Sequence, residues 1–235
     1  MRSLRLRSVG VTAVTAVAAV GLLPVVAAGA TAPHVTCHAC GRNLIANPGA
    51  EAGKGANGDY VVKVPDWQVT GDFTAEEYAS GEDLSPTSPG PTNRGKNYFY
   101  GGPYATQSTG SQLIKVGTSG ITSGKITYVL SAWLGGYADQ GDYTTLTATF
   151  ESAAAKTLST VTLGPVTAAQ RHDASELLER QRTGLVPAST ARVKVEMVMV
   201  KLVGGDDDGL ADNLSLVFST PQVGVPLGNV APTDK

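Results

Sequence analysis

Histidine is scarce in this chain of 235 residues, and a common signature of hydrolases is missing. There are three histidines, of which His34 and His38 lie near the start and His172 lies in a polar stretch. No Gly-x-Ser-x-Gly motif is present, which excludes the exposed serine nucleophile that this motif forms. Glu76 and Asp83 fall in a stretch that we expect to be an irregular loop, a poor place to fix a catalytic pair. We therefore expect a protein that is not an enzyme.

Cysteine is nearly absent too, since only Cys37 and Cys40 occur. In an exported chain, their close spacing favours a small local disulfide. A redox motif would place the first cysteine at the start of a helix in a βαβ unit, whereas the residues after Cys40 lead into an expected strand. A metal site made with His34 and His38 has suitable ligand types, but its spacing is cramped. We expect both cysteines to be in disulfide form.

Long apolar runs are absent except at the start of the chain. Residues 9–26 are apolar, follow three arginines and lead to small residues that end at Ala30. This pattern predicts a secretory signal peptide over residues 1–30, and a retained membrane anchor is disfavoured because Gly21 and Pro24 interrupt the run. After its removal, no run of membrane-spanning length remains. We expect a secreted, extracellular protein that makes no membrane contact.

Charged side chains are few, because Asp, Glu, Lys and Arg make up 16% of the chain. Removing residues 1–30 takes three of the 18 basic residues and none of the 20 acidic ones, which leaves a net charge of −5. This sign argues against nucleic acid or an anionic membrane surface as a partner. The Gly, Ser, Thr and Val that dominate the remainder are typical of an extracellular β-sandwich.

The strongest pattern that the chain contains is a pair of alternating segments within residues 126–150. In the first segment, Leu130, Ala132 and Leu134 share one face, and Trp133 lies on the other. In the second segment, three apolar residues alternate with threonines: Leu146, Ala148 and Phe150. A period of two predicts half-buried strands rather than helices.

The loop between these segments, residues 135–143, has three glycines, two aspartates and two tyrosines. It is longer than a tight hairpin turn, and its composition favours a ligand-facing edge. Sugar binding needs flat aromatic faces and polar side chains for hydroxyls. The candidate ligand-binding residues are Trp133, Tyr137, Asp139, Asp142 and Tyr143, together with Tyr100 and Tyr104 from a second aromatic segment. The alternative is that the aromatic residues are core, as we expect for Trp67 and Phe99.

Turn-forming residues divide the chain into about eight expected strands, which fits an all-β, two-sheet antiparallel β-sandwich of the jelly-roll type. We expect a leader over residues 31–42, the sandwich over 43–219 and a disordered tail over 220–235. The only helix-like stretch is 167–182. The patterning of the chain alone therefore predicts the fold class.

Three short motifs resemble those of galactose-binding-like jelly rolls, which include carbohydrate-binding modules of the family 4/9/22 type. Residues 43–51 (NLIANPGAE) look like the "N-L-x-x-N-x-x-F-E" start of these domains. Residues 128–133 (YVLSAW) are similar to their "Y-x-L-S-x-W" strand, and residues 211–216 (ADNLSL) to their closing "D-D-V-S-L" strand. Two positions depart from the pattern, because Ala50 replaces an aromatic residue and Asn213 replaces the second aspartate.

This resemblance implies a structural calcium ion where the first and last motifs meet. Glu51 and Asp212 would supply carboxylates, and backbone carbonyls at 47–49 would complete the oxygen shell that calcium prefers. The alternative is that both residues are ordinary turn and cap residues. The acidic run 206–208 has no EF-hand spacing, and we expect it to be a solvated turn.

The resemblance implies a non-catalytic, lectin-like module that binds a polysaccharide or a cell-surface glycan. Two other classes of function stay open. One is an extracellular structural or adhesion protein that uses the same sandwich to bind protein or cell wall, and the other is a polysaccharide hydrolase or lyase. A glycan array separates the first two, and loss of activity at one carboxylate would identify the third.

Overall fold

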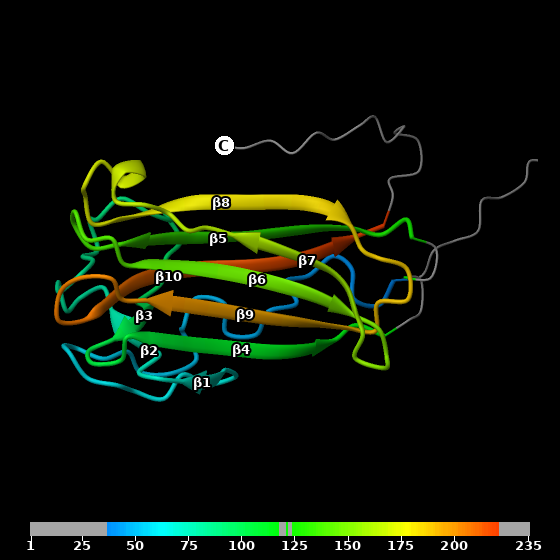
Figure 1. The fold of residues 1–235 in the computed structure, drawn as a ribbon, viewed down its shortest axis with the longest axis horizontal. Coiled ribbons are helices and arrows are strands. Elements are labelled where there is room, and N and C mark those ends of the chain that lie inside the picture. The colour runs from blue at the N-terminus through cyan, green and yellow to red at the C-terminus, as the bar shows by residue number, and fades with distance from the viewer. Residues whose placement is uncertain (1–36, 118–120, 122–123, 221–235) are drawn as a thin grey trace, which may run out of the picture. The chain divides into compact units, whose positions relative to one another are not determined.

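The computed structural model describes residues 37–117, 121 and 124–220 (Figure 1). The expected signal peptide, the first part of the expected leader and nearly all of the expected tail lie outside these residues. Among the described residues, no helix is long and apolar enough to cross a membrane.

Two five-stranded sheets make up the fold, and every strand pair is antiparallel (Figure 1). The first sheet has, in spatial order, β1 (Gln68–Thr70), β4 (Gln107–Lys115), β9 (Arg192–Val200), β6 (Tyr143–Glu151) and β7 (Thr157–Leu163). The second sheet has β2 (Thr74–Glu77), β3 (Asn97–Gly102), β10 (Asp207–Ser219), β5 (Thr127–Gly136) and β8 (Glu176–Leu185). The predicted β-sandwich of the jelly-roll type is confirmed.

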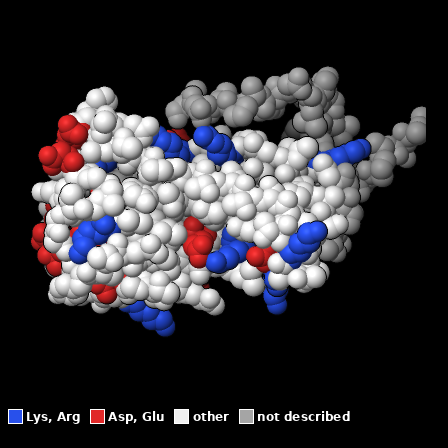
Figure 2. Space-filling view, viewed as in Figure 1, with Lys and Arg blue, Asp and Glu red and all other residues white. Residues whose placement is uncertain are grey.

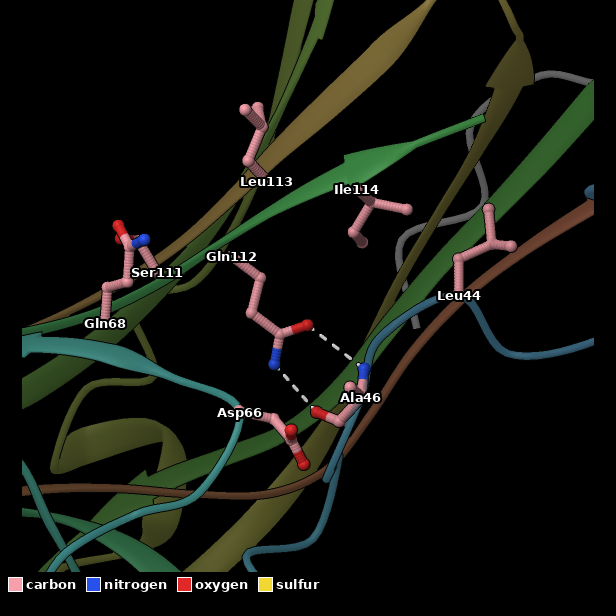
Figure 3. Close-up of a pocket in the computed structure, with 8 residues that line it drawn as sticks. All are labelled: Leu44, Ala46, Asp66, Gln68, Ser111, Gln112, Leu113 and Ile114. Carbon is pink, nitrogen blue, oxygen red and sulfur yellow. Dashed lines mark hydrogen bonds between the residues drawn. The ribbon is translucent and has the colours of Figure 1, made fainter. Parts of the chain in front are cut away.

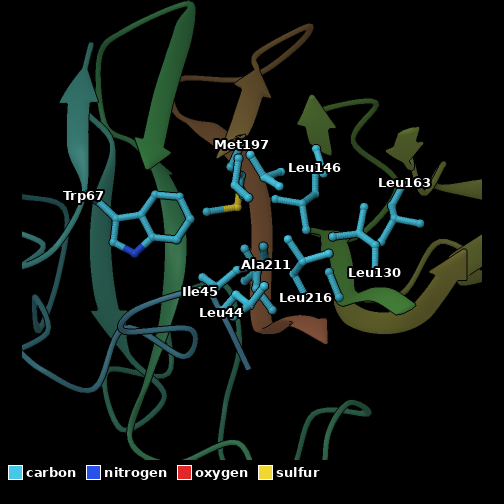
Figure 4. Close-up of a cluster of buried hydrophobic side chains, with 14 of the residues drawn as sticks. Leu44, Ile45, Trp67, Leu130, Leu146, Leu163, Met197, Ala211 and Leu216 are labelled. Atoms are coloured by element: carbon cyan, nitrogen blue, oxygen red, sulfur yellow. The ribbon is translucent and has the colours of Figure 1, made fainter. Parts of the chain in front are cut away.

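The core lies between the two sheets and follows from the alternation of each strand. In β9, Val193, Val195, Met197 and Met199 are fully buried, while the residues between them are half-buried. Figure 4 shows side chains from both sheets meeting in one cluster. Burying each such side chain contributes about 1.5–3 kcal/mol. Trp67 belongs to this core, as predicted.

The beginning of the described chain is packed against its last strand. The amide of Gly41 donates to the Phe218 carbonyl at 2.9 Å, and that of Leu44 donates to the Leu216 carbonyl at 2.9 Å. The side chain of Asn43 donates to the Leu214 carbonyl at 2.9 Å. This segment therefore lies along β10 beyond the first residue of β3, Asn97, and extends the second sheet.

The end of the expected leader also belongs to the folded domain. Cys37 and Cys40 form a disulfide, and both pack against the main core. Ala39, between them, is buried. The disulfide therefore fixes a short turn against the closing strand.

Two stretches differ from their predicted form because sheet pairing decides their conformation. Within 167–182, only Ala169–Arg171 is helical, as a short 3-10 turn (η2), and β8 begins at Glu176. The residues of β8 pair along the whole of β5, and this pairing overrides the weak helical pattern of the sequence. Glu76 and Glu77 likewise lie in strand β2 and not in an irregular loop.

Candidate functional site

Four loops meet at one end of the sandwich, on the left in Figure 1. Strand pairing places them there: Gly102 at the end of β3 pairs with Asp207 at the start of β10, and Tyr143 at the start of β6 pairs with Val200 at the end of β9. Gly136 at the end of β5 pairs with the first residue of β8. We call this region the loop end; its loops cover residues 103–106, 137–142, 164–175 and 201–206.

Large apolar side chains are exposed at the loop end. Tyr104 is 76% exposed, Tyr137 38%, Leu202 61% and Val203 49%. We call these four residues the loop-end patch. Contacts join the loops that carry them, since Lys201 Nζ donates to the Tyr104 carbonyl at 3.2 Å. Exposed aromatic and aliphatic groups on joined loops are typical of a binding surface.

A buried carboxylate holds the patch in place. Asp142 is 1% exposed, and its Oδ1 accepts hydrogen bonds from the amides of Leu202 at 2.7 Å and Val203 at 2.9 Å. Its Oδ2 accepts from the Asp208 amide at 3.1 Å. The interpretation of Asp142 as a ligand-binding residue is therefore wrong, because its oxygens are buried and committed to backbone amides. It positions the patch instead.

A buried arginine fixes the same region from the other side. Arg171 is the last residue of η2 and is fully buried. Its Nη1 donates to the carbonyls of Ala138, at 2.7 Å, and Ala174, and its Nη2 donates to that of Gln140 at 3.0 Å. The guanidinium thus joins the β5–β6 loop to the β7–β8 loop. Sequence reasoning missed this residue, since a single arginine in a polar stretch carries no sign of burial.

The predicted ligand-binding residues fall in three places. Tyr104, Tyr137 and Asp139 are exposed on the loop end. Tyr143 is half-buried and lies at the start of β6 beside Val200. Asp142 is buried within the loop end. Trp133 and Tyr100 lie on the outer face of the second sheet, and Tyr100 is 1% exposed. The prediction that Tyr100 contacts ligand is wrong, because its ring is buried in an apolar cluster with Leu84 and Leu210.

Trp133 is separate from the loop-end patch. It packs, half-buried, against a second apolar cluster made of Tyr78, Leu84, Tyr98, Tyr100, Leu177 and Leu210. Its predicted orientation, opposite the core residues of β5, agrees with this position on the outer face. The structure therefore does not bring Trp133 together with Tyr104 and Tyr137.

Carboxylates lie around this second cluster and raise one another's pKa values. Burial, followed by the neighbouring carboxylates of Asp208 and Glu76, raises the pKa of Asp83 to about 9. Glu76 is 1% exposed and accepts a hydrogen bond from the Tyr98 hydroxyl at 2.5 Å. Its own pKa is raised by burial. Glu76 is thus shielded from solvent, and Asp83 is half-buried with its Oδ2 enclosed.

Part of the predicted calcium-ligand set lies around Gly49. The Asp212 Oδ1 and the Asn213 Oδ1 lie 3.2 and 3.4 Å from the position that a β-carbon on Gly49 would take. The Glu51 Cγ lies 3.9 Å from that position, and the Glu51 carboxylate lies against Gly95. The Pro48 carbonyl accepts from the Leu214 amide at 2.9 Å, which ties the first turn to β10. Oxygens of one amide and two carboxylates suit calcium.

Hydrogen bonds already engage part of this oxygen set. Asp212 is fully buried, and its Oδ2 accepts from the Tyr78 hydroxyl at 2.8 Å. Glu51 Oε1 accepts from the amides of Lys96 and Asn97 at 2.9 and 2.8 Å. In the described part of the chain, no three His, Cys, Asp or Glu side chains gather as a metal centre. Asp212 Oδ1 also accepts from the Asn213 amide at 2.6 Å, so both oxygens of this carboxylate are engaged. The oxygen donor types suit calcium, and a bound ion would be held by Glu51 and Asp212 with amide and carbonyl oxygens.

A groove of about 390 Å³ lies beside β4 (Figure 3). The Gln112 side chain crosses it: Nε2 donates to the Ala46 carbonyl at 2.7 Å, and Oε1 accepts from the Ala46 amide at 3.0 Å. Both polar atoms of the Gln112 side chain are therefore hydrogen-bonded to the backbone of Ala46. These bonds join β4 to the N-terminal segment across the groove.

The outer face of the first sheet is polar and largely uncharged. Thr145, Thr147 and Thr149 lie on it in alternate positions of β6. Figure 2 shows few charged groups across this side of the molecule. Two ion pairs lie on it, Arg192 with Glu151 at 2.6 Å and Lys194 with Glu196 at 2.8 Å. This face adjoins the loop end at Tyr143.

Comparison with known proteins identifies likenesses in structure only. No protein-family model matches the chain, and no curated protein has a matching sequence. The enzymatically active domain of tailspike protein 4 from bacteriophage CBA120 is 12% identical, with a TM-score of 0.49 over 75% of this chain and 21% of that one. A family 16 carbohydrate-binding module is 20% identical, with a TM-score of 0.46 over 74% of this chain and 99% of the module.

A xylan-binding domain of family 22 from Paenibacillus barcinonensis is 9% identical, with a TM-score of 0.38 over 70% of this chain and 92% of the domain. The chain thus spans about a fifth of the tailspike domain and nearly all of each module. The predicted resemblance to carbohydrate-binding modules is found among solved structures, and at these identities it concerns the fold alone.

Proposed function

We propose that this protein is a secreted, non-catalytic carbohydrate-binding module whose loop-end patch binds a polysaccharide or a cell-surface glycan. The observation that carries the proposal is the exposure of Tyr137 and Tyr104 on loops that are held in place. Arg171 bonds to the loop of Tyr137, and the Asp72 carboxylate accepts from the Tyr104 amide at 3.0 Å. Aromatic rings bind the C–H faces of sugars, and the exposed Asp139 supplies a carboxylate for hydroxyls. A rigid platform loses little entropy on binding.

Replacing Tyr104 or Tyr137 with alanine should weaken binding to the retained polysaccharide about tenfold each, because each variant loses a stacking ring worth about 1.4 kcal/mol. Affinity gel electrophoresis against a panel of polysaccharides measures the retardation. Leu185→Ala is the matched control, since Leu185 is 54% exposed at the far end of β8. Unchanged retardation in both tyrosine variants would move the binding surface elsewhere on the protein.

An adhesion function is the second candidate, and the exposure of Leu202 and Val203 favours it. Aliphatic side chains suit a protein partner better than a sugar. A glycan array distinguishes the two, because an adhesion protein would bind none of the saccharides. Turnover of a polysaccharide that is lost when one carboxylate is replaced would instead identify a hydrolase or lyase.

We also propose that calcium binds at Glu51 and Asp212 and joins the first turn to the closing strand. A ligand that binds only the folded state stabilises it by about 2.7 kcal/mol at a hundredfold excess over its dissociation constant. The melting temperature should therefore fall in chelator and recover when calcium is added. Asp212→Asn should remove most of this response, whereas Asp139→Asn, at an exposed loop residue, should keep it. If chelator leaves the melting temperatures of the unchanged protein and of Asp139→Asn the same, the site is refuted.

A further inference from the structure

The acidic run 206–208 differs from its predicted form as a solvated turn. Asp207 and Asp208 are the first residues of β10, and they are 0% and 4% exposed. Asp207 pairs with Gly102 of β3, so its place in the second sheet is set by the strand register. A carboxylate buried in this way needs hydrogen bonds or a counter-charge.

The Asp207 carboxylate has only part of what it needs. Its Oδ1 accepts from the Gly209 amide at 3.2 Å, while its Oδ2 is buried with no hydrogen-bond partner. Thr144 of β6, in the opposite sheet, is 1% exposed, and its hydroxyl also has no partner. Two such groups together call for an explanation, since nearly all buried polar atoms in native proteins are paired.

Both residues face the same glycine from opposite sheets. Thr144 Oγ1 lies 3.0 Å, and Asp207 Oδ1 3.1 Å, from the position that a β-carbon on Gly209 would take. The carbonyl oxygen of Tyr143 lies 2.7 Å from that position. A carboxylate, a hydroxyl and a carbonyl are thus gathered at this junction of the two sheets. All three are hard oxygen donors.

The charge around the junction is negative. Burial raises the pKa of Asp207, and the carboxylates of Asp142 and Asp208 raise it further, to about 7. Within the described chain, Asp207 forms no ion pair. Lys201, whose charge acts on Asp207, donates hydrogen bonds from Nζ to the carbonyls of Tyr104 and Gly205 at 3.2 and 2.9 Å. A cation would supply the missing counter-charge and accept the unpaired oxygens.

We propose a second calcium site at this junction, distinct from that at Glu51 and Asp212, with Asp207, the Thr144 hydroxyl and the Tyr143 carbonyl as ligands. The donors select a hard cation, because no sulfur or imidazole nitrogen is present. The site ties β6 to β10 directly beneath the loop-end patch. Calcium bound there would order the loops that present Tyr104 and Tyr137, whatever ligand they bind.

Calcium titration by calorimetry on the full mature chain tests the proposal. Asp212→Asn should keep this site and Asp207→Asn should lose it, so each variant binds one ion fewer than the unchanged protein. Thr144→Val, which preserves the shape of the side chain, should bind calcium at this site at least tenfold more weakly. Asp206→Asn is the matched control, since this neighbouring acidic residue is not among the ligands.

A melting experiment in chelator adds a readout that a merely structural role would not give. Without metal, Asp207→Asn should melt above the unchanged protein, because the amide removes a buried charge, yet it should gain less on adding calcium. Equal calcium stoichiometry in Asp207→Asn and the unchanged protein would overturn the proposal. The proposal would also be overturned if the calcium response disappeared entirely in Asp212→Asn. An ordered water would then be the group that fills the junction.

Discussion

Replacing Arg171 with methionine should lower the free energy of unfolding by about 3 kcal/mol or more. The methionine fills similar space but donates no hydrogen bond, and the carbonyls of Ala138, Ala174 and Gln140 then lose their donor. A buried acceptor left without a donor costs about 1–3 kcal/mol. Urea denaturation measures the change from the transition midpoint and slope.

Arg171→Lys sharpens this test, because an ammonium can reach some of the three carbonyls but lacks the planar arrangement of donors. The free energy of unfolding of Arg171→Lys should lie between that of the methionine variant and that of the unchanged protein. Lys156→Met, at an exposed residue of the turn between β6 and β7, is the control for losing a positive charge. A methionine variant within 0.5 kcal/mol of the unchanged protein would show that water can satisfy these carbonyls, an outcome typical of surface positions.

In chelator, stability should fall as pH rises from about 4 to about 9. Asp83 is the main cause, since burial and the nearby Asp208 and Glu76 raise its pKa from 3.8 to about 9. In the unfolded chain, the Asp83 carboxyl loses its proton near its ordinary pKa of 3.8. In the folded protein, it keeps the proton up to a pH of about 9. The stabilisation is therefore complete below pH 4 and is lost on the way to pH 9, at about 1.4 kcal/mol for each unit of pKa difference.

Asp83→Asn should flatten this dependence, because the amide stays neutral at every pH. Denaturation in urea at pH 5, 7 and 9 compares the two slopes. Asp139→Asn removes an exposed carboxylate and should leave the slope as it is in the unchanged protein. If Asp83→Asn shows the same decline as the unchanged protein, the proton is held elsewhere in the acidic cluster.

The strands with strict alternation were predictable from sequence, because a period of two is a local property. This holds for β5, β6 and β9, whose apolar residues are the core. β8 was not predictable, since its outer residues are mostly polar and its structure comes from pairing with β5. Local composition could not distinguish these polar residues from a helix.

The candidate site was predictable only in outline. The glycine-rich loop after β5 correctly indicated a place where side chains are exposed, and Tyr137 is one of them. The burial of Asp142 depends on amides 60 and 61 residues further along the chain. That of Arg171 depends on carbonyls of a loop more than 30 residues away. Such partners are set by the fold as a whole, and no short motif records them.

The packing of the N-terminal segment along β10 has a consequence for the order in which the domain forms. Asn43 bonds to Leu214 and Leu216, across 171 and 173 residues of chain. Closing so long a loop costs entropy before any contact repays it, and domains rich in such distant pairings fold in milliseconds to seconds. During synthesis, the first segment must wait without its partner until the last strand has emerged, so the sandwich can close only when nearly the whole chain has been made.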